Sequence, residues 1–296
     1  MDFLRIDDLT PDGLRAVLAS AESARHDPSA VAGRLTGQSV GLFFQKPSTR
    51  TRVSTELASA QLGAIPVVLG QQEVGFGSRE AVKDVAAVLD RYLDVIAMRV
   101  FKHADLVEVA EHAQAPVINL LSDVEHPCQA LADLQTIAEE RPMAGTTIAY
   151  VGDGNNVLHS LMVGAAMMEM NVRIATPDGY EPDPEYVTKA ESFGDVLITN
   201  DAEEAVRGAD VVYTDVWASM GQEEEAEERS RLFSPYRVDL ALFEQAAEDA
   251  IFLHCLPAHR GSEVTDAVLD HVRSRVLDQA ENRLHTFKAL LLHVIE

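Results

Sequence analysis

Short apolar runs alternate with amphipathic stretches along nearly the whole chain, and this alternation constrains the fold more than any other feature. Strands separated by helices form parallel sheets with helices on both faces. The first half of the chain is therefore predicted to be an α/β domain, with a first helix capped by Thr10, a loop over residues 71–79 and a helix over residues 80–93. Its buried strands are predicted at Val40–Phe44, Ile65–Leu69, Val95–Met98 and Pro116–Leu120.

The alternation restarts after Arg141–Gly145, which is a plausible domain boundary. Further strands are predicted at Thr147–Val151, Val172–Ala175, Val196–Thr199, Val211–Thr214 and Ile251–Leu253. The sequence thus predicts two doubly wound α/β domains with parallel sheets and an active site in the interdomain cleft. We expect a first domain over residues 1–141 and a second over 142–273, with a C-terminal helix, residues 274–296, packing back on the first.

Length and cysteine content narrow the class of protein. The 296 residues suit two domains of ordinary size, or one large one. The acidic start, Met1–Asp8, lacks the apolar core of a signal peptide, and no apolar run is long enough to span a membrane. Two cysteines, Cys128 and Cys255, do not make a disulfide framework. We therefore expect a cytoplasmic protein without a membrane partner.

Charge is the unusual property of this composition. Asp and Glu total 48 against 24 Lys and Arg, which gives a formal net charge of -24. This balance argues against nucleic acid as a partner, because phosphate backbones require basic patches. Self-repulsion at this charge density favours a salty environment, since molar salt reduces the screening length to about 3 Å. We hypothesise a halophilic protein; the alternative is an ordinary acidic cytosolic protein. The acidic residues 223–228 are expected to form a solvated loop.

The stretch Ser48-Thr49-Arg50-Thr51-Arg52 follows the first strand and opens a helix that runs to about Gln61. Its first hydroxyl lies where a helix N-cap belongs. A helix N-terminus offers free backbone N–H groups and about half a positive charge, so with hydroxyls and guanidinium groups it suits a phosphate dianion. The alternative is an ordinary solvated cap. The chain has no G-x-x-x-x-G-K-[ST] pattern, so the sequence predicts a phosphate site rather than a nucleotide site.

Unusual polar residues follow five of the predicted strands, at the carboxyl ends where ligands bind in open α/β sheets. An incomplete glycine pattern after Val151 argues against a nicotinamide cofactor, and His126 and Cys128 could serve as a cap and a core residue. His254, Cys255 and His259 could be proposed as zinc ligands, but they lack the usual spacing of zinc ligands. No metal is therefore expected. The polar groups are Arg99, Asp123–Gln129, Asp153–Asn156, Asp215–Gly221 and His254–Gly261.

Together these motifs resemble the signatures of the aspartate/ornithine transcarbamoylase family. The motifs that carry the resemblance include His126-Pro127-Cys128-Gln129 and Ser48–Arg52, of which the Ser48–Arg52 motif belongs to the whole superfamily. Ser219-Met220-Gly221 and His254-Cys255-Leu256-Pro257 are similar to the ornithine branch. The resemblance extends from the first helix to Glu281-Asn282-Arg283.

The resemblance implies a reaction: carbamoyl phosphate and L-ornithine give citrulline and phosphate, without a metal or organic cofactor. It also implies a homotrimer or a multiple of trimers. Two alternatives remain open at this point. One is transfer to another amine, such as putrescine or an acylated ornithine, and the other is a non-catalytic protein that kept the fold.

The resemblance also assigns residues to roles. The implied catalytic residues are Arg99, His126, Cys255 and Asp215; the first two would donate to the carbamoyl oxygen. The implied ornithine ligands are Asn156, with Asn155 as its neighbour, Asp215, Ser219 and Met220. The implied carbamoyl phosphate ligands are Ser48, Thr49, Arg50, Thr51, Arg99, His126, Pro127, Cys128, Gln129, Cys255, Leu256 and Arg283.

Two further expectations concern protons and subunits. The attacking amine must be neutral, and with a pKa of about 10.4 only about one molecule in a thousand is neutral at pH 7.4. We expect Cys255, coupled to Asp215, to receive or guide the proton. In many relatives a Gln or His from an adjacent subunit contacts carbamoyl phosphate; here that position holds Gly75, and Gln71 or Gln72 is the candidate substitute.

Overall fold

The computed structural model describes residues 1–75, 79–218 and 225–295. The chain forms two compact units, the first made of Met1–Gln135 and Glu281–Glu296 and the second of Thr136–Ala280. These divisions fall inside helices α6 (Pro127–Glu140) and α13 (Val276–Ile295), whereas the boundaries predicted from sequence lie after residues 141 and 273. A helix can belong to two units in turn, which composition along the chain does not reveal.

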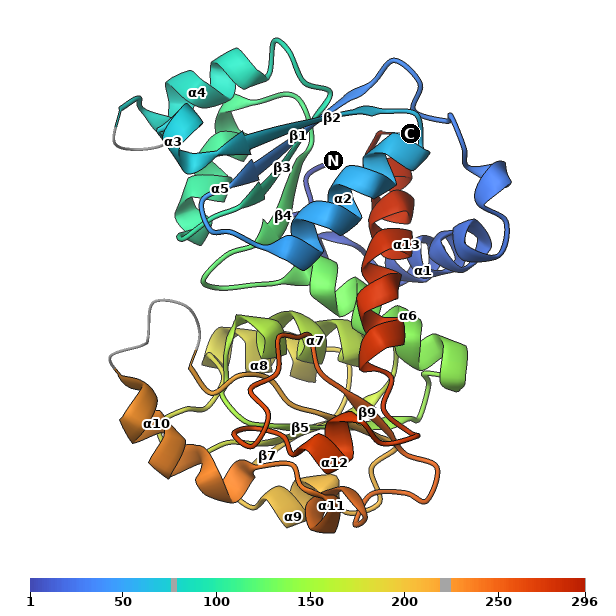
Figure 1. The fold of residues 1–296 in the computed structure, drawn as a ribbon, viewed down its shortest axis with the longest axis vertical. Helices are drawn as coiled ribbons and strands as arrows, with labels where there is room; N and C mark the ends of the chain where they lie inside the picture. The colour runs from blue at the N-terminus through green and yellow to red at the C-terminus, as the bar shows by residue number, and fades with distance from the viewer. Residues whose placement is uncertain (76–78, 219–224, 296) are drawn as a thin grey trace. The chain divides into compact units, whose positions relative to one another are not determined.

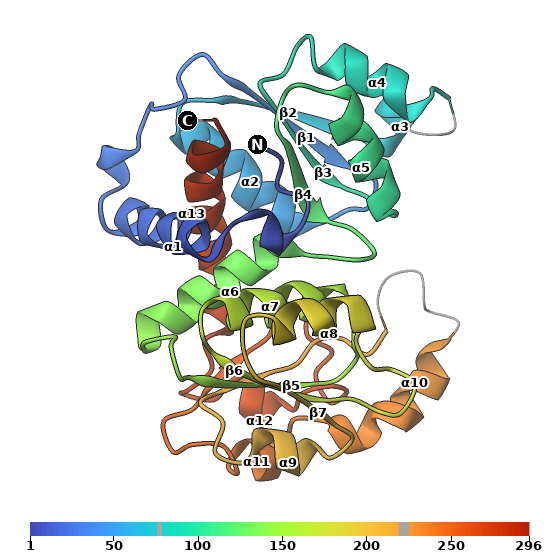
Figure 2. The same cartoon turned by 180° about the vertical axis from the view of Figure 1, so that it is seen from behind.

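The first unit is built on a four-stranded parallel sheet in the order β2-β1-β3-β4. Helices α4 and α5 cover one face, and α2 and α13 cover the other (Figures 1 and 2). Strands β1, β3 and β4 are largely buried on both faces, as a doubly covered parallel sheet requires, whereas the edge strand β2 is only partly buried. The elements are α1 (Pro11–His26), β1 (Ser39–Phe44), α2 (Thr49–Gln61), β2 (Ile65–Gly70), α3 (Gln71–Val74), α4 (Val82–Leu89), β3 (Val95–Arg99), α5 (His103–His112) and β4 (Val117–Leu121).

Two local predictions in this unit are wrong. Residues 71–74 form the short helix α3 rather than a loop, because the Glu73 carboxylate accepts a 2.7 Å hydrogen bond from the Gly70 backbone N–H at its start. Gly75 then ends α3 with a φ of 66°, which glycine adopts without strain. The helix predicted over residues 80–93 is shorter and spans Val82–Leu89. The predicted Thr10 cap of α1 is confirmed, since its hydroxyl accepts from the Gly13 N–H at 3.1 Å.

The second unit is a five-stranded parallel sheet in the order β7-β6-β5-β8-β9. Helices α7 and α8 lie on one face, and α9, α11 and α12 lie on the other (Figure 1). The acidic loop predicted over residues 223–228 is wrong for residues 226–228, which open helix α10, and residues 223–224 lie outside the described residues. The elements are β5 (Thr147–Val151), α7 (Asn156–Met167), β6 (Asn171–Ala175), α8 (Pro184–Glu191), β7 (Val196–Thr199), α9 (Ala202–Val206), β8 (Val211–Tyr213), α10 (Ala226–Phe233), α11 (Leu240–Phe243), β9 (Ile251–Leu253) and α12 (Asp266–Leu269). The predicted fold class, two doubly wound units with parallel sheets, is confirmed.

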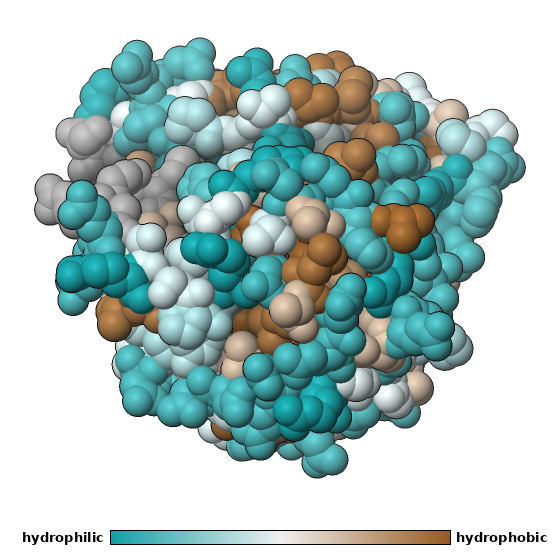
Figure 3. Space-filling model, turned by 60° about the horizontal axis from the view of Figure 1, so that its bottom comes forward, coloured by the Kyte–Doolittle hydropathy of each residue, from teal (hydrophilic) through white to brown (hydrophobic). Residues whose placement is uncertain are grey.

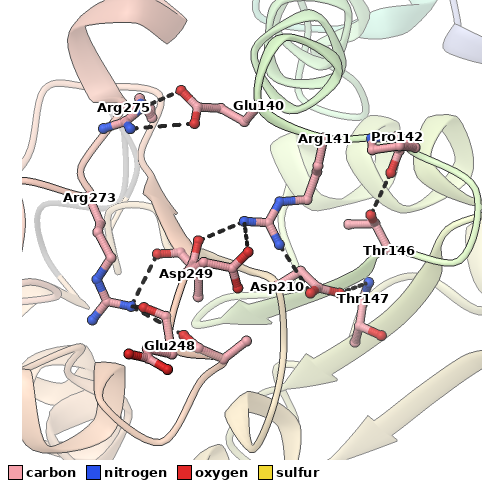
Figure 4. A network of polar contacts seen from close by, with 12 residues as sticks. Glu140, Arg141, Pro142, Thr146, Thr147, Asp210, Glu248, Asp249, Arg273 and Arg275 are labelled. Carbon is pink, nitrogen blue, oxygen red and sulfur yellow. Dashed lines mark hydrogen bonds and ion pairs between the residues drawn. The ribbon is translucent and has the colours of Figure 1, made fainter.

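Arginine side chains hold the amino-terminal edge of the second sheet (Figure 4). Arg141 donates to Asp210 at 3.0 Å, and the same carboxylate accepts from the backbone N–H of Thr147, the first residue of β5, at 2.7 Å. Arg273 donates to the Glu248 carbonyl at 2.9 Å, and Arg275 pairs with Glu140. These contacts fix the edge opposite the carboxyl ends of the strands, so they support the sheet without entering the ligand side.

One face of the surface is mainly hydrophilic (Figure 3). Hydrophilic residues cover most of the face drawn in Figure 3, and hydrophobic residues are scattered between them. Across residues 1–75, 79–218 and 225–295, none of the helices combines the length and the apolar character needed to cross a membrane.

Candidate active site

The strand order of each unit brings the predicted site residues to one edge of a sheet. In the first unit, β1, β3 and β4 are neighbours, and Ser48, Arg99 and His126 lie at or after their carboxyl ends. In the second unit, β5, β8 and β9 are neighbours, and their ends lead to Asn155, Asp215 and Cys255, respectively. In both sheets the strand order reverses beside these strands, which is where open α/β sheets bind ligands.

The phosphate motif forms the N-terminus of α2 as predicted. Ser48 is the N-cap, and its hydroxyl accepts from the Thr51 N–H at 3.4 Å. Thr49 and Arg50 are exposed, whereas Thr51 is buried. The first turn of α2 therefore presents helix N–H groups beside a guanidinium group, an arrangement suited to an anion.

Arg283 on α13 reaches the same region of the first unit. Its guanidinium donates to the Thr51 hydroxyl at 3.3 Å and to the Gln129 side-chain oxygen at 2.6 Å. The amide group of Gln129 in turn donates to Asp133 at 2.8 Å. The oxygen of Gln129, an implied carbamoyl phosphate ligand, therefore also orients Arg283.

Three arginines of this unit act on His126. It is buried directly before α6, and its carbonyl accepts from the Gln129 N–H at 2.9 Å, so it also has the capping position considered from sequence. Burial and the guanidinium groups of Arg283, Arg99 and Arg50 hold the pKa of His126 well below 6.5. The imidazole is therefore neutral at physiological pH and can donate a hydrogen bond without adding charge.

Cys128 is a core residue, which is one of the two roles that the sequence allows; the other is a carbamoyl phosphate ligand. It is buried in the first turn of α6, one residue after Pro127, and its thiol donates to the Asn119 carbonyl at 3.3 Å. Burial raises the pKa of the thiol to about 12, so it stays protonated. Its side chain points into the protein.

Asp215 organises the predicted site of the second unit. One of its carboxylate oxygens accepts from the Cys255 thiol at 3.0 Å, and the other accepts from the Asn155 amide at 2.8 Å. The Asn155 side-chain oxygen caps α7 by accepting from the N–H groups of Val157 and Leu158, at 3.0 and 3.1 Å. Asn155 therefore positions Asp215, while Asn156, the ligand predicted from sequence, is half-exposed at the start of α7.

The turn after β9 is held by a pair that sequence reasoning missed. His254 Nδ1 accepts from the Leu256 N–H at 2.9 Å, so its Nε2 carries the proton and donates to Glu263 at 3.2 Å. The same oxygen of Glu263 accepts from the His259 N–H. Both side chains of this pair are fully buried, and Leu256 has a left-handed φ of 57°. The pair fixes the turn that presents Cys255 and the Leu256 backbone.

Within the described ranges, one cluster has metal-ligand geometry: Asp215, His254 and Cys255 each offer a ligand atom within 4.8 Å of the others. Both ring nitrogens of His254 already make hydrogen bonds, one as an acceptor and one as a donor. A metal would have to replace one of them, so the donor set does not favour a metal site. The predicted absence of a metal stays a prediction.

Arg229 and Asp153 form a second pair that sequence reasoning did not assign. Arg229 donates to Asp153 at 3.0 Å, to the Trp217 carbonyl at 3.0 Å and to Glu225 at 3.0 Å. Burial raises the pKa of Asp153 to about 6, even though Arg229 opposes the shift. The predicted ligands Ser219 and Met220 lie outside the described residues.

The left-handed backbone at position 75 explains why this residue is a glycine. Its φ is 66°, and a Cβ atom at this position would lie 2.7 Å from the Cβ of Arg79. A Gln or His would be strained here. The cross-subunit contact predicted for Gln71 or Gln72 stays a prediction.

Two doubly wound units, one with a candidate anion site at the start of α2 and one with a candidate acceptor site around Asp215, define a two-domain α/β enzyme. The family model described as Aspartate/ornithine carbamoyltransferase, carbamoyl-P binding domain, matches residues 1–139. The one described as Aspartate/ornithine carbamoyltransferase, Asp/Orn binding domain, matches residues 144–294. The chain belongs to the aspartate/ornithine carbamoyltransferase family.

Individual relatives agree with this assignment. The chain is 49% identical to an ornithine carbamoyltransferase of Thermococcus kodakarensis, over 99% of this chain and 96% of the relative. Among solved structures it is similar to the ornithine carbamoyltransferase of Pyrococcus furiosus, with a TM-score of 0.96 and 47% identity over 99% of this chain and 96% of that one. It is also similar to an acetylornithine transcarbamylase complexed with acetylcitrulline, with a TM-score of 0.89 and 30% identity over 100% of this chain and 99% of that one.

Proposed function

We propose that this protein transfers the carbamoyl group of carbamoyl phosphate to the side-chain amine of L-ornithine, giving L-citrulline and phosphate. The observation that carries the proposal is the buried His126, on which the guanidinium groups of Arg283, Arg99 and Arg50 act. Such a set neutralises a phosphate dianion and also supplies hydrogen-bond donors for a carbonyl oxygen. The similarity to the ornithine carbamoyltransferases of Thermococcus kodakarensis and Pyrococcus furiosus supports ornithine as the acceptor.

Carbamoyl phosphate is assigned to the first unit. The N-terminus of α2, with Ser48, Thr49, Arg50 and Thr51, binds the phosphate. Arg99 and His126 donate to the carbamoyl oxygen, where negative charge develops in the tetrahedral transition state. The neutrality of His126 suits this role, because an uncharged imidazole can donate without repelling the three arginines.

Ornithine is assigned to the second unit. Asp215 accepts from the α-amino end, and Asn156 contacts the backbone of the amino acid. The hydrogen bond from the Cys255 thiol to Asp215 supports a proton path. As the new C–N bond forms, the amine proton passes to Cys255 Sγ while the thiol proton moves to Asp215. The C–O bond to phosphate breaks, and phosphate leaves with the electron pair.

The test is citrulline formation from carbamoyl phosphate in the presence of ornithine, putrescine, aspartate and N-acetylornithine as competing acceptors, at low and molar salt. Turnover with ornithine alone supports the proposal. Turnover with N-acetylornithine instead would favour the activity of the 30% identical acetylornithine transcarbamylase. If a folded protein binds carbamoyl phosphate but turns over none of the acceptors, the chain is a non-catalytic member of the family.

We also propose a homotrimer, or a multiple of trimers, in the cytoplasm. Two exposed apolar side chains one turn apart on α2, Val53 and Leu57, belong to the same unit as exposed Ile65 at the start of the edge strand β2. Exposed apolar side chains of this kind suit contact with a second copy. Light scattering should give a trimer mass that Leu57→Glu lowers. The matched control is Leu277→Glu, at a more exposed leucine of the second unit. An unchanged mass in L57E would place the interface elsewhere.

A further inference from the structure

We propose that Arg229 is a positioning residue for the ornithine half of the site, acting through Asp153 and through the backbone that follows Asp215. The inference rests on the proposed function, because it concerns the acceptor of that reaction. Arg229 itself contacts no reacting atom in the proposed reaction. It holds two separate loops in the arrangement that the acceptor requires.

The contacts of Arg229 are unusually complete for a charged side chain. Only 7% of the residue is exposed. One terminal nitrogen, Nη1, donates both to the Asp153 carboxylate and to the Trp217 carbonyl, each at 3.0 Å. The Nε atom donates to Glu225 at 3.0 Å, and the guanidinium carbon lies 4.9 Å from the centre of the Tyr180 ring. A buried guanidinium held by several groups is a rigid anchor.

Both loops that Arg229 holds carry residues of the proposed ornithine site. Asp153 lies in the turn between β5 and α7, and its carbonyl accepts from the N–H of Asn155 at 2.8 Å. Asn155 binds the carboxylate of Asp215. From the other side, Trp217 is two residues beyond Asp215 on the loop after β8. Loss of Arg229 therefore releases Asp215 and the start of α7 together.

The charges around Asp153 make this arrangement sensitive to pH. The carboxylate of Asp153 faces one cation, Arg229, and two anions, Asp215 and Glu225. The buried hydroxyl of Tyr150 is also close to it. Burial raises the pKa of Asp153 to about 6. Below that pH the carboxyl group is protonated, the ion pair with Arg229 is lost, and ornithine binding weakens. Above it the pair is intact.

The decisive variant is Arg229→Gln, with Arg231→Gln as its control. Arg231 is exposed on the same helix, α10, and its replacement removes the same charge. We expect R229Q to raise the KM for ornithine about 10- to 100-fold while changing the KM for carbamoyl phosphate less than about twofold. R231Q should change neither. R229K should recover part of the loss, since an ammonium can bind Asp153 but cannot hold all of the partners at once.

Asp153→Asn tests the pH dependence of the KM for ornithine, which a purely structural role of the pair would leave unchanged. In the wild-type protein, the KM for ornithine should rise as the pH falls below about 6. In D153N this KM should already be high at pH 7.5 and should lose the inflection. The KM for ornithine of the double variant R229Q/D153N should exceed that of the more affected single variant by no more than about twofold. Both substitutions remove the same ion pair, so their effects should not add.

Binding of L-norvaline in the presence of carbamoyl phosphate, measured by calorimetry, gives a readout without turnover, because norvaline lacks the side-chain amine. R229Q should weaken this binding by the same factor. An R229Q protein with an unchanged ornithine KM overturns the inference, as does one in which both KM values rise together with loss of thermal stability. Absence of ornithine turnover in the wild-type protein would instead overturn the proposed function.

Discussion

His126 is the residue on which the charge balance of the first unit depends. Three guanidinium groups act on it, and burial prevents it from taking up a fourth positive charge. A protonated imidazole here would be destabilised by its neighbours, so His126 is set to donate from its neutral form. Arg99, buried at the end of β3, is the second donor that we propose for the carbamoyl oxygen.

We expect His126→Ala to lower kcat about 100- to 1000-fold, the usual effect of losing a donor to a developing oxyanion. The KM for carbamoyl phosphate should change little, because the α2 site that binds the phosphate is retained. His112→Ala on the exposed end of α5 is the matched control and should retain full activity. Steady-state assays with both substrates varied measure the effect. A loss of less than about fivefold in H126A would remove His126 from the catalytic set.

The pH dependence of the rate distinguishes titration of His126 from titration of the ornithine side-chain amine. Because the pKa of His126 lies well below 6.5, its imidazole stays neutral from neutral to alkaline pH and contributes no inflection there. The attacking amine, with a pKa of about 10.4, gains its neutral form as the pH rises. The rate at subsaturating ornithine should therefore climb from neutral to alkaline pH. A flat profile over this range, with chemistry limiting, would refute the proposed proton path.

At the scale of elements, helix caps connect the fold to the site. Thr10 caps α1 far along the chain from any proposed ligand, Ser48 caps α2 at the phosphate motif, and Asn155 caps α7 while holding Asp215. An N-cap hydrogen bond therefore stabilises α1 alone, whereas in α7 the capping residue also holds a residue of the proposed ornithine site.

Replacing two of these caps distinguishes the roles. Asn155→Ala and Thr10→Ala should each cost about 1 kcal/mol of unfolding free energy, the usual value of an N-cap side chain. N155A alone should raise the KM for ornithine, by about tenfold, because the Asp215 carboxylate loses a hydrogen-bond partner. Denaturant unfolding and steady-state kinetics on both variants provide the measurement. Equal kinetics in N155A and T10A would show that Asn155 is only a cap.

How much of this structure could be predicted from the sequence depends on the distance between interacting residues. Strand periodicity and the caps at Thr10 and Ser48 are local, so they were predicted correctly. The pair of Arg229 and Asp153 joins residues 76 positions apart, and no pattern in either neighbourhood indicates it. Glu263 is close to His254 in sequence, but nothing local shows that both are fully buried. The sequence therefore indicated the ligand-binding candidates, whereas the residues that position them required the fold.

At the scale of the whole molecule, the net charge of -24 must be reconciled with two compact α/β units. Some acidic side chains are neutralised locally, as Asp210 is by Arg141 and Asp270 by Arg260. Many others are exposed, and acids outnumber Lys and Arg two to one. Their mutual repulsion acts over about 30 Å at 0.01 M salt but only about 3 Å at 1 M.

We therefore expect the protein to unfold at a higher temperature, and to be more active, in molar KCl than in dilute buffer. The triple variant Glu191→Gln, Asp195→Asn and Glu244→Gln removes three acidic charges and should reduce the salt needed for half-maximal stability. The control is the charge-preserving triple variant Glu191→Asp, Asp195→Glu and Glu244→Asp, which should behave as the wild type does. Thermal unfolding followed by circular dichroism across a KCl series measures both. Full stability in dilute buffer would reject the halophilic hypothesis, because the repulsion would then already be balanced within the fold.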